Sequence, residues 1–167
     1  RKEPSACGIL WREGQAVPMQ RPITGYHQDE KGDWVAELSC GHGQHVRHKP
    51  PFSLRPWVTS PEGRGSMLRT ELDCVRCDRF EFPEGFAVYK RTPEFDEASI
   101  PLGLQKNHST KAGVWGVIHV LSGRLRYHLD GLDGRELVLD PENSGIVLPE
   151  VIHHVAADGP VRFFVEF

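Results

Sequence analysis

Residues 117–129 read VIHVLSGRLRYHL, and the spacing of apolar residues in this stretch decides the fold of the second half of the chain. A short apolar run ends at Ser122-Gly123. The residues after it alternate between two faces, with Leu125, Tyr127 and Leu129 on one and Arg124, Arg126 and His128 on the other. Alternation with a period of two is typical of β-strands that bury one face. The stretch therefore predicts two consecutive strands, the second with His128 on its polar face.

The rest of the C-terminal half repeats this pattern. Turn sequences at 130–134 (DGLDG), 141–145 (PENSG) and 158–160 (DGP) separate further short apolar runs. Short strands at regular spacing, with glycine and proline turns between them, predict an antiparallel β-barrel or sandwich over residues 86–167. This half shows no long helical pattern and no internal repeat.

The first half is organised differently. Residues 33–38 predict a strand, whereas residues 49–66 are rich in proline, glycine and serine and predict a loop. Residues 81–85 have the composition of a linker. We therefore expect a mainly β chain in three parts: an N-terminal extension at 1–18, a loop-rich Cys/His module at 19–80 and an antiparallel barrel at 86–167.

The bulk composition excludes several classes of protein. Of 167 residues, 38% are hydrophobic and 26% charged, which suits a folded chain. No apolar run reaches the roughly 18 residues of a membrane span, and no signal peptide opens the chain, so we expect a cytoplasmic protein with no membrane partner. Residues 86–167 carry 8 basic and 11 acidic residues, which disfavours binding to nucleic acid. The basic cluster at 47–49 is the local exception.

The cysteines point to a metal site in the first half. Cys74-x-x-Cys77 can form a tight knuckle around tetrahedral zinc, and Cys40 with His42, on one glycine-rich turn, can supply the second pair. His45 and His48 remain alternates for the fourth ligand. A metal would help a small, loop-rich module that has little core.

Two other interpretations of these cysteines stay open. A redox C-x-x-C normally starts a helix, but Asp73 precedes this one and no helical pattern follows. The cysteines could also be ordinary thiols, as we expect for Cys7 in the extension. A cytosolic disulfide is disfavoured.

Two histidines of the second half lie on separate β-like runs. His108 and His153 are 45 residues apart, but closure of a small barrel would bring them together as a pocket for a metal or a small anion. The plain alternative places His108 on a loop and makes His153 a hydrogen-bonded barrel residue. We expect His119, His128 and His154 at the surface, and Trp115 in the core.

Both halves resemble bacterial families. Residues 20–77 resemble a small family of unknown function on GYHQD (25–29), WVAELSCGHGQHVRH (34–48) and LDCVRC (72–77), and this resemblance implies no activity. Residues 87–167 resemble the tellurite-resistance TehB/YeaR-like family of small cupins. The second match is carried by YKRTPEF (89–95), HSTKAGVWG (108–116), LSGRL (121–125), PEVIH (149–153) and FFVEF (163–167).

The second resemblance implies a cupin barrel with an altered metal site. Cupins hold a metal on three histidines and a glutamate, whereas Thr110 and Gly116 stand at two of those positions here, so only His108 and His153 remain. Glu150 or Glu166 could add a carboxylate, which would suit Fe²⁺, Zn²⁺ or Mn²⁺. Lys111 could then hold an anionic ligand.

These observations lead to one main hypothesis and two alternatives. The main one is a two-domain metal-binding protein, with a structural zinc module and a small cupin that binds a metal or small anionic ligand, in a response to oxyanion or nitrosative stress. The first alternative is a metal-dependent enzyme, an oxygenase or hydrolase, acting on a small polar substrate. The second is a module that binds protein or nucleic acid. We also expect a homodimer paired through strand edges.

Overall fold

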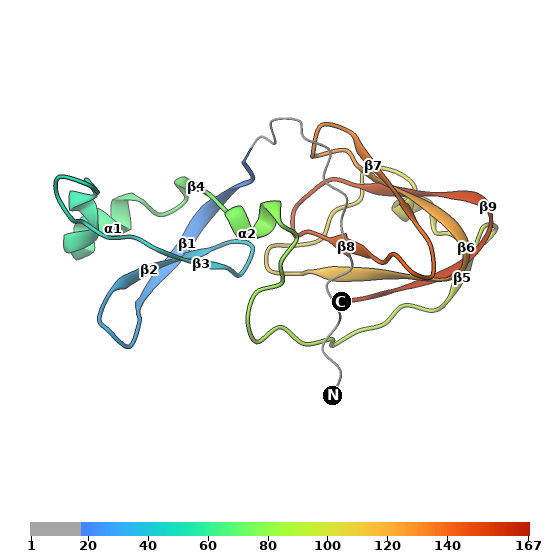
Figure 1. The fold of residues 1–167 in the computed structure, drawn as a ribbon, viewed down its shortest axis with the longest axis horizontal. Helices are drawn as coiled ribbons and strands as arrows, with labels where there is room; N and C mark the ends of the chain where they lie inside the picture. The colour runs from blue at the N-terminus through green and yellow to red at the C-terminus, as the bar shows by residue number, and fades with distance from the viewer. Residues whose placement is uncertain (1–17) are drawn as a thin grey trace.

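The computed structural model describes residues 18–167. The expected extension at 1–18, except for Pro18, and Cys7 therefore lie outside the described residues. Within residues 18–167, no helix has both the length and the apolar character that a membrane span requires. The described chain is mainly β, as predicted, with a Cys/His-containing module followed by a curled sheet (Figure 1).

The N-terminal module is a small antiparallel sheet with short helices around it. Its strands lie in the order β3-β2-β1-β4, and the predicted strand at 33–38 is β2. Its elements are β1 (Gln20–Gln28), β2 (Trp34–Leu38), β3 (Gly43–His45), β4 (Glu71–Asp73), the 3₁₀ helix η1 (Pro56–Thr59), α1 (Pro61–Ser66) and α2 (Val75–Asp78).

The segment at 49–66 is more ordered than its composition predicts. It contains η1 and α1, so the prediction of a plain loop is wrong here. The local cause is a helix cap: the Ser60 hydroxyl accepts a hydrogen bond from the Gly63 N–H at 3.0 Å, and Pro61 stands in the first turn. Proline, glycine and serine thus mark the start of a short helix as well as a loop.

The C-terminal half is a curled antiparallel sheet that forms a half-barrel. The strand order is β5-β9-β6-β7, and β8 pairs with β6. Strands β6 and β9 are long and run side by side through the middle of the sheet (Figure 1). The elements are β5 (Phe95–Asp96), η2 (Leu102–Leu104), β6 (Gly116–Leu129), β7 (Arg135–Leu139), β8 (Gly145–Val147) and β9 (His154–Glu166).

Strand β6 corrects one prediction and confirms another. The expected break at Ser122-Gly123 is an irregularity in the pairing with β9, and the two predicted strands are one strand of 14 residues. Gly123 has φ of 78°, and a Cβ there would lie 2.0 Å from the Pro160 carbonyl oxygen. Beyond this point the predicted alternation holds, because Leu125, Tyr127 and Leu129 are fully buried.

The two halves share one apolar core. The same cluster of buried side chains includes Ile23 and Leu38 of the module and Trp115 and Ile118 of the half-barrel. In Figure 1, α2 lies on the side of the module that faces the half-barrel. Because α2 also carries Cys77, the predicted metal ligands lie close to this junction.

Substitution of Gly123 by alanine should destabilise the protein by about 2–4 kcal/mol, because the new Cβ meets the β9 backbone and the backbone conformation disfavours L side chains. Gly134→Ala is the matched control, since Gly134 also has positive φ (68°) but has no atom within 4 Å of the added Cβ. Urea unfolding measures both. Equal losses in the two variants would show that the contact with Pro160 has no effect.

Candidate metal centre and histidine pair

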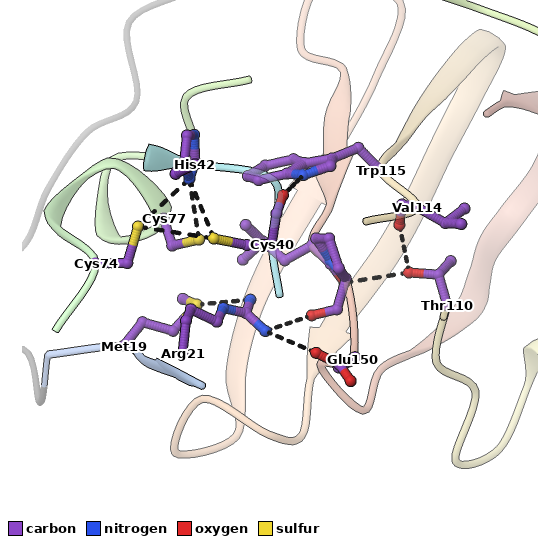
Figure 2. A network of polar contacts seen from close by, with 12 residues as sticks. Met19, Arg21, Cys40, His42, Cys74, Cys77, Thr110, Val114, Trp115 and Glu150 are labelled. Carbon is purple, nitrogen blue, oxygen red and sulfur yellow. Dashed lines mark hydrogen bonds and ion pairs between the residues drawn. The ribbon is translucent and has the colours of Figure 1, made fainter. Parts of the chain in front are cut away.

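Four buried side chains converge where the module meets the half-barrel. The ligand atoms of Cys40, His42, Cys74 and Cys77 all lie within 4.8 Å of one another. His42 Nδ1 is 3.4 Å, 3.3 Å and 3.6 Å from the sulfurs of Cys40, Cys74 and Cys77 (Figure 2). Donors bound to one zinc ion at about 2.0–2.3 Å lie roughly 3.4–3.8 Å apart. The Cys40 and Cys74 sulfurs are 3.9 Å apart, so the printed spacings lie close to those of a tetrahedral site.

Two local turns place these donors. Cys40 and His42 flank Gly41, whose φ of 91° allows the tight turn between β2 and β3, and Gly41 N–H donates to Leu38 O at 2.8 Å. Cys74 is the N-cap of α2 and Cys77 lies within its single turn. A helix of one turn therefore follows Cys74, and the prediction that no helix follows the cysteine pair is wrong. The convergence of four donors still favours a metal site over a two-cysteine redox site.

Hydrogen bonds among the four side chains shift the pKa values of His42, Cys74 and Cys77. Burial lowers the pKa of His42, but hydrogen bonds to Cys40 and Cys74 outweigh this effect and raise the pKa to about 9. Hydrogen bonds from Cys40 and Cys77 lower the pKa of Cys74, whereas those to Cys40 and Cys74 raise the pKa of Cys77. A bound cation would replace these protons, because zinc ligands are deprotonated.

The two alternate histidine ligands are engaged elsewhere. His45 Nε2 lies 2.8 Å from an Asp29 carboxylate oxygen, and His48 Nδ1 accepts a hydrogen bond from the Arg55 N–H at 3.1 Å. The structure therefore brings His42, and neither alternate, to the three cysteines.

The structure also brings His108 and His153 together. Their backbones exchange two hydrogen bonds of 2.9 Å and 2.8 Å, and His108 Nδ1 is 3.1 Å from His153 Nε2. His153 Nδ1 lies 2.9 Å from the Val151 carbonyl, which can only accept, so Nδ1 carries the proton and Nε2 has the lone pair. His108 then donates to His153, and its own Nε2 remains as an acceptor.

A small cavity lies beside this pair. It has a volume of about 20 Å³, and its walls include Ile118, Val147 and Phe163 together with the two histidines. A space of this size has room for about one water molecule. Burial lowers the pKa of both histidines, which favours the neutral imidazoles that can bind a metal.

The two glutamates predicted as further ligands pair with other residues. The Glu150 carboxylate lies 3.9 Å from Arg21, and the Glu166 carboxylate lies 3.1 Å from His119. Lys111 is exposed. Among residues 18–167, the cysteine–histidine cluster is the only group of three or more candidate ligands with this spacing, so neither glutamate joins the histidine pair in a ligand set.

The remaining histidines and Trp115 lie close to where the sequence places them. His119, His128 and His154 are partly exposed, and each lies beside a carboxylate. His128 and His154 also stack, with ring centroids 4.3 Å apart. Trp115 is buried, as expected of a core residue.

Sequence reasoning missed Arg21, which is only 4% exposed. Its guanidinium donates to the Pro149 carbonyl at 2.7 Å and lies 3.2 Å from the Met19 sulfur (Figure 2). A usable signal was present, because Arg21 and Ile23 of β1 alternate with Met19 just before the strand, and all three are buried.

Acidification should weaken the fold through the histidine pair. The pKa values of His108 and His153 are lower in the folded protein than the roughly 6.5 of an unfolded chain, so the unfolded chain binds more protons as pH falls through that value. The free energy of unfolding should therefore fall between pH 7.5 and pH 5.5, and less so in His153→Gln. Urea titrations at both pH values measure this, and an equal fall in both proteins would contradict it.

Comparisons with known proteins agree with the division into two parts. Residues 24–81 match a family model described as a protein of unknown function (DUF3565), and residues 90–165 match that of the TehB-like domain. Both resemblances expected from the sequence are thus confirmed. The matching families and relatives are not described as cupins, so that assignment stays a prediction.

The similarity to TehB covers part of that protein. Over 73 residues the chain is 33% identical to the probable S-adenosyl-L-methionine-dependent methyltransferase TehB of Haemophilus influenzae, covering 41% of this chain and 26% of TehB. The match to the crystal structure of that TehB covers 48% of this chain and 30% of the TehB chain, with 29% sequence identity. A crystal structure of an E. coli (strain K12) protein matches 52% of this chain and 92% of its own, with 19% identity. The TM-score is 0.46 in both cases. This chain therefore spans about a quarter of the length of TehB.

Proposed function

We propose that this chain, whose residues 90–165 form a TehB-like domain, is a zinc-stabilised two-domain protein that binds a small ligand in its half-barrel. Cys40, His42, Cys74 and Cys77 hold one Zn²⁺. The observation that carries this proposal is the convergence of four buried donor atoms from two distant turns within 4.8 Å.

The donor set favours zinc over other cations. Three thiolates and one imidazole are soft or borderline ligands, and zinc takes them in a closed tetrahedral site. With all four positions filled by protein, such a site is structural. Cys40 and Cys74 are 34 residues apart, so the ion closes a long loop in a small module.

Cys77→Ser should remove the zinc and lower the free energy of unfolding by more than about 3 kcal/mol, since the binding energy of a structural zinc contributes to folding. His45→Gln is the matched control, because His45 lies in the same module but bonds to Asp29. Elemental analysis and urea unfolding measure the two effects. A Cys77→Ser protein with a full complement of zinc would remove Cys77 from the site.

The half-barrel offers a second site at the histidine pair. Two imidazole nitrogens on neighbouring positions of one ion lie about 3.0–3.4 Å apart, and His108 and His153 present theirs at 3.1 Å. His153 also donates its other ring N–H to Val151, as metal-bound histidines commonly do to a carbonyl. We propose that the pair binds Fe²⁺, Zn²⁺ or Mn²⁺ in a cupin-like pocket and leaves open positions for water or a small anion.

The His108→Ala/His153→Ala double variant tests whether the half-barrel holds a second metal. If the pair holds a metal, wild-type protein purified without a tag should carry a second metal that the double variant loses, while His119→Ala retains it. The second metal would justify a screen for oxygenase and hydrolase activity. One zinc in all three proteins would leave the half-barrel without a metal and contradict this site.

A role in oxyanion or nitrosative stress is supported by the family resemblance alone. Homodimerisation through strand edges is likewise a proposal, and a solution mass near 18.8 kDa by light scattering would contradict it.

A further inference from the structure

The N-terminal module contacts the chain segment that carries His108 and the segment that carries His153. The Trp115 indole N–H, seven residues after His108, donates to the Cys40 carbonyl at 2.7 Å. The Pro149 carbonyl, four residues before His153, accepts from Arg21 at 2.7 Å. Figure 2 shows Trp115 and Arg21 beside the cysteine–histidine cluster. Each histidine is thus linked to the module through a short stretch of chain.

The link through Arg21 reaches both segments. Arg21 fixes the Pro149 carbonyl, and the next residue, Glu150, has φ of 60° and donates its N–H to Thr110 O at 3.0 Å. A non-glycine residue in this region persists where its surroundings hold it. Thr110 is two residues from His108. The turn at Glu150 therefore sets the alignment of the His108 segment against the His153 segment.

A buried guanidinium needs a compensating charge. Glu150 is 3.9 Å from Arg21, but its side chain is 42% exposed, and Arg21 Nε has no hydrogen-bond partner among residues 18–167. Arg21 is instead held by its contacts with Pro149 and Met19. The segment that carries Arg21 is also joined to the cluster, because the Cys74 N–H donates to the Met19 carbonyl at 2.8 Å.

We propose that Arg21 is a positioning residue that couples metal occupancy of the cysteine–histidine centre to the geometry of the His108–His153 pair. The inference rests on the zinc site proposed above. With the metal bound, Arg21 stays buried and holds Pro149 and Glu150 in place. When a chelator removes the metal, the turns that carry Cys40 and Cys74 lose their common anchor. The contacts of Trp115 with Cys40 and of Arg21 with Pro149 then loosen, the turn at Glu150 relaxes and the histidines separate. The pocket is then competent only in the metal-loaded protein.

Amide hydrogen exchange on the full-length, zinc-loaded protein tests this coupling, because it reports local opening residue by residue. In Arg21→Lys, which keeps the charge but loses the forked donor, protection of the His153 N–H should fall at least tenfold, while the Tyr127 N–H in β6 stays unchanged. Arg79→Lys is the matched control, because Arg79 lies in the same module but is exposed and pairs with Glu81. A fall smaller than tenfold at His153 would overturn the role of Arg21.

Chelation of zinc from the wild-type protein tests the metal half of the coupling. Protection at His153 should again fall at least tenfold relative to Tyr127, and added zinc should restore it. Protection at His153 that follows Tyr127 within tenfold would overturn the coupling. A wild-type protein that carries no metal would defeat the proposed zinc site, whereas Arg21→Lys would still report whether Arg21 positions His153. The two failures are therefore distinguishable.

Discussion

The convergence of three cysteines and one histidine at the junction of the two modules is the constraint on which the rest of the structure depends. The module around them is a sheet of short strands with helices of only a few residues, and it has little core of its own. Its buried side chains join those of the half-barrel in a single cluster. A metal ion at this point would organise the module and the surface on which the half-barrel packs.

The half-barrel depends on this junction for the placement of its histidines. The sheet itself is built on the long pairing of β6 with β9, but His108 and His153 lie outside both strands, in connecting segments. Those segments meet through an isolated backbone bridge and are held at Trp115 and Pro149 by the N-terminal module. The two histidines are thus linked physically to a cysteine cluster that is distant from them in the sequence.

Sequence patterns predicted the features that local geometry sets. The Cys-x-x-Cys spacing and the turn at Gly41 identified the four converging donors, and the alternation at 125–129 identified a buried strand face. Glycine occurs both at the ends of strands and at bulges within them, and the sequence pattern does not separate the two cases. Gly123 lies at a bulge within β6, where we expected the end of a strand. The sequence could not predict that Glu150 pairs with Arg21 or that Glu166 pairs with His119. Both pairs join residues that are distant in the sequence and meet only in the folded structure.

X-ray absorption at the zinc edge of the untagged 167-residue protein shows directly which atoms surround the ion. We expect a tetrahedral ion with three sulfur ligands at about 2.3 Å and one nitrogen ligand at about 2.0 Å. Any second zinc at the histidine pair would add nitrogen and oxygen neighbours only, so the His108→Ala/His153→Ala protein gives the clean spectrum. A zinc site without sulfur ligands, or a protein that binds no zinc, would contradict the account.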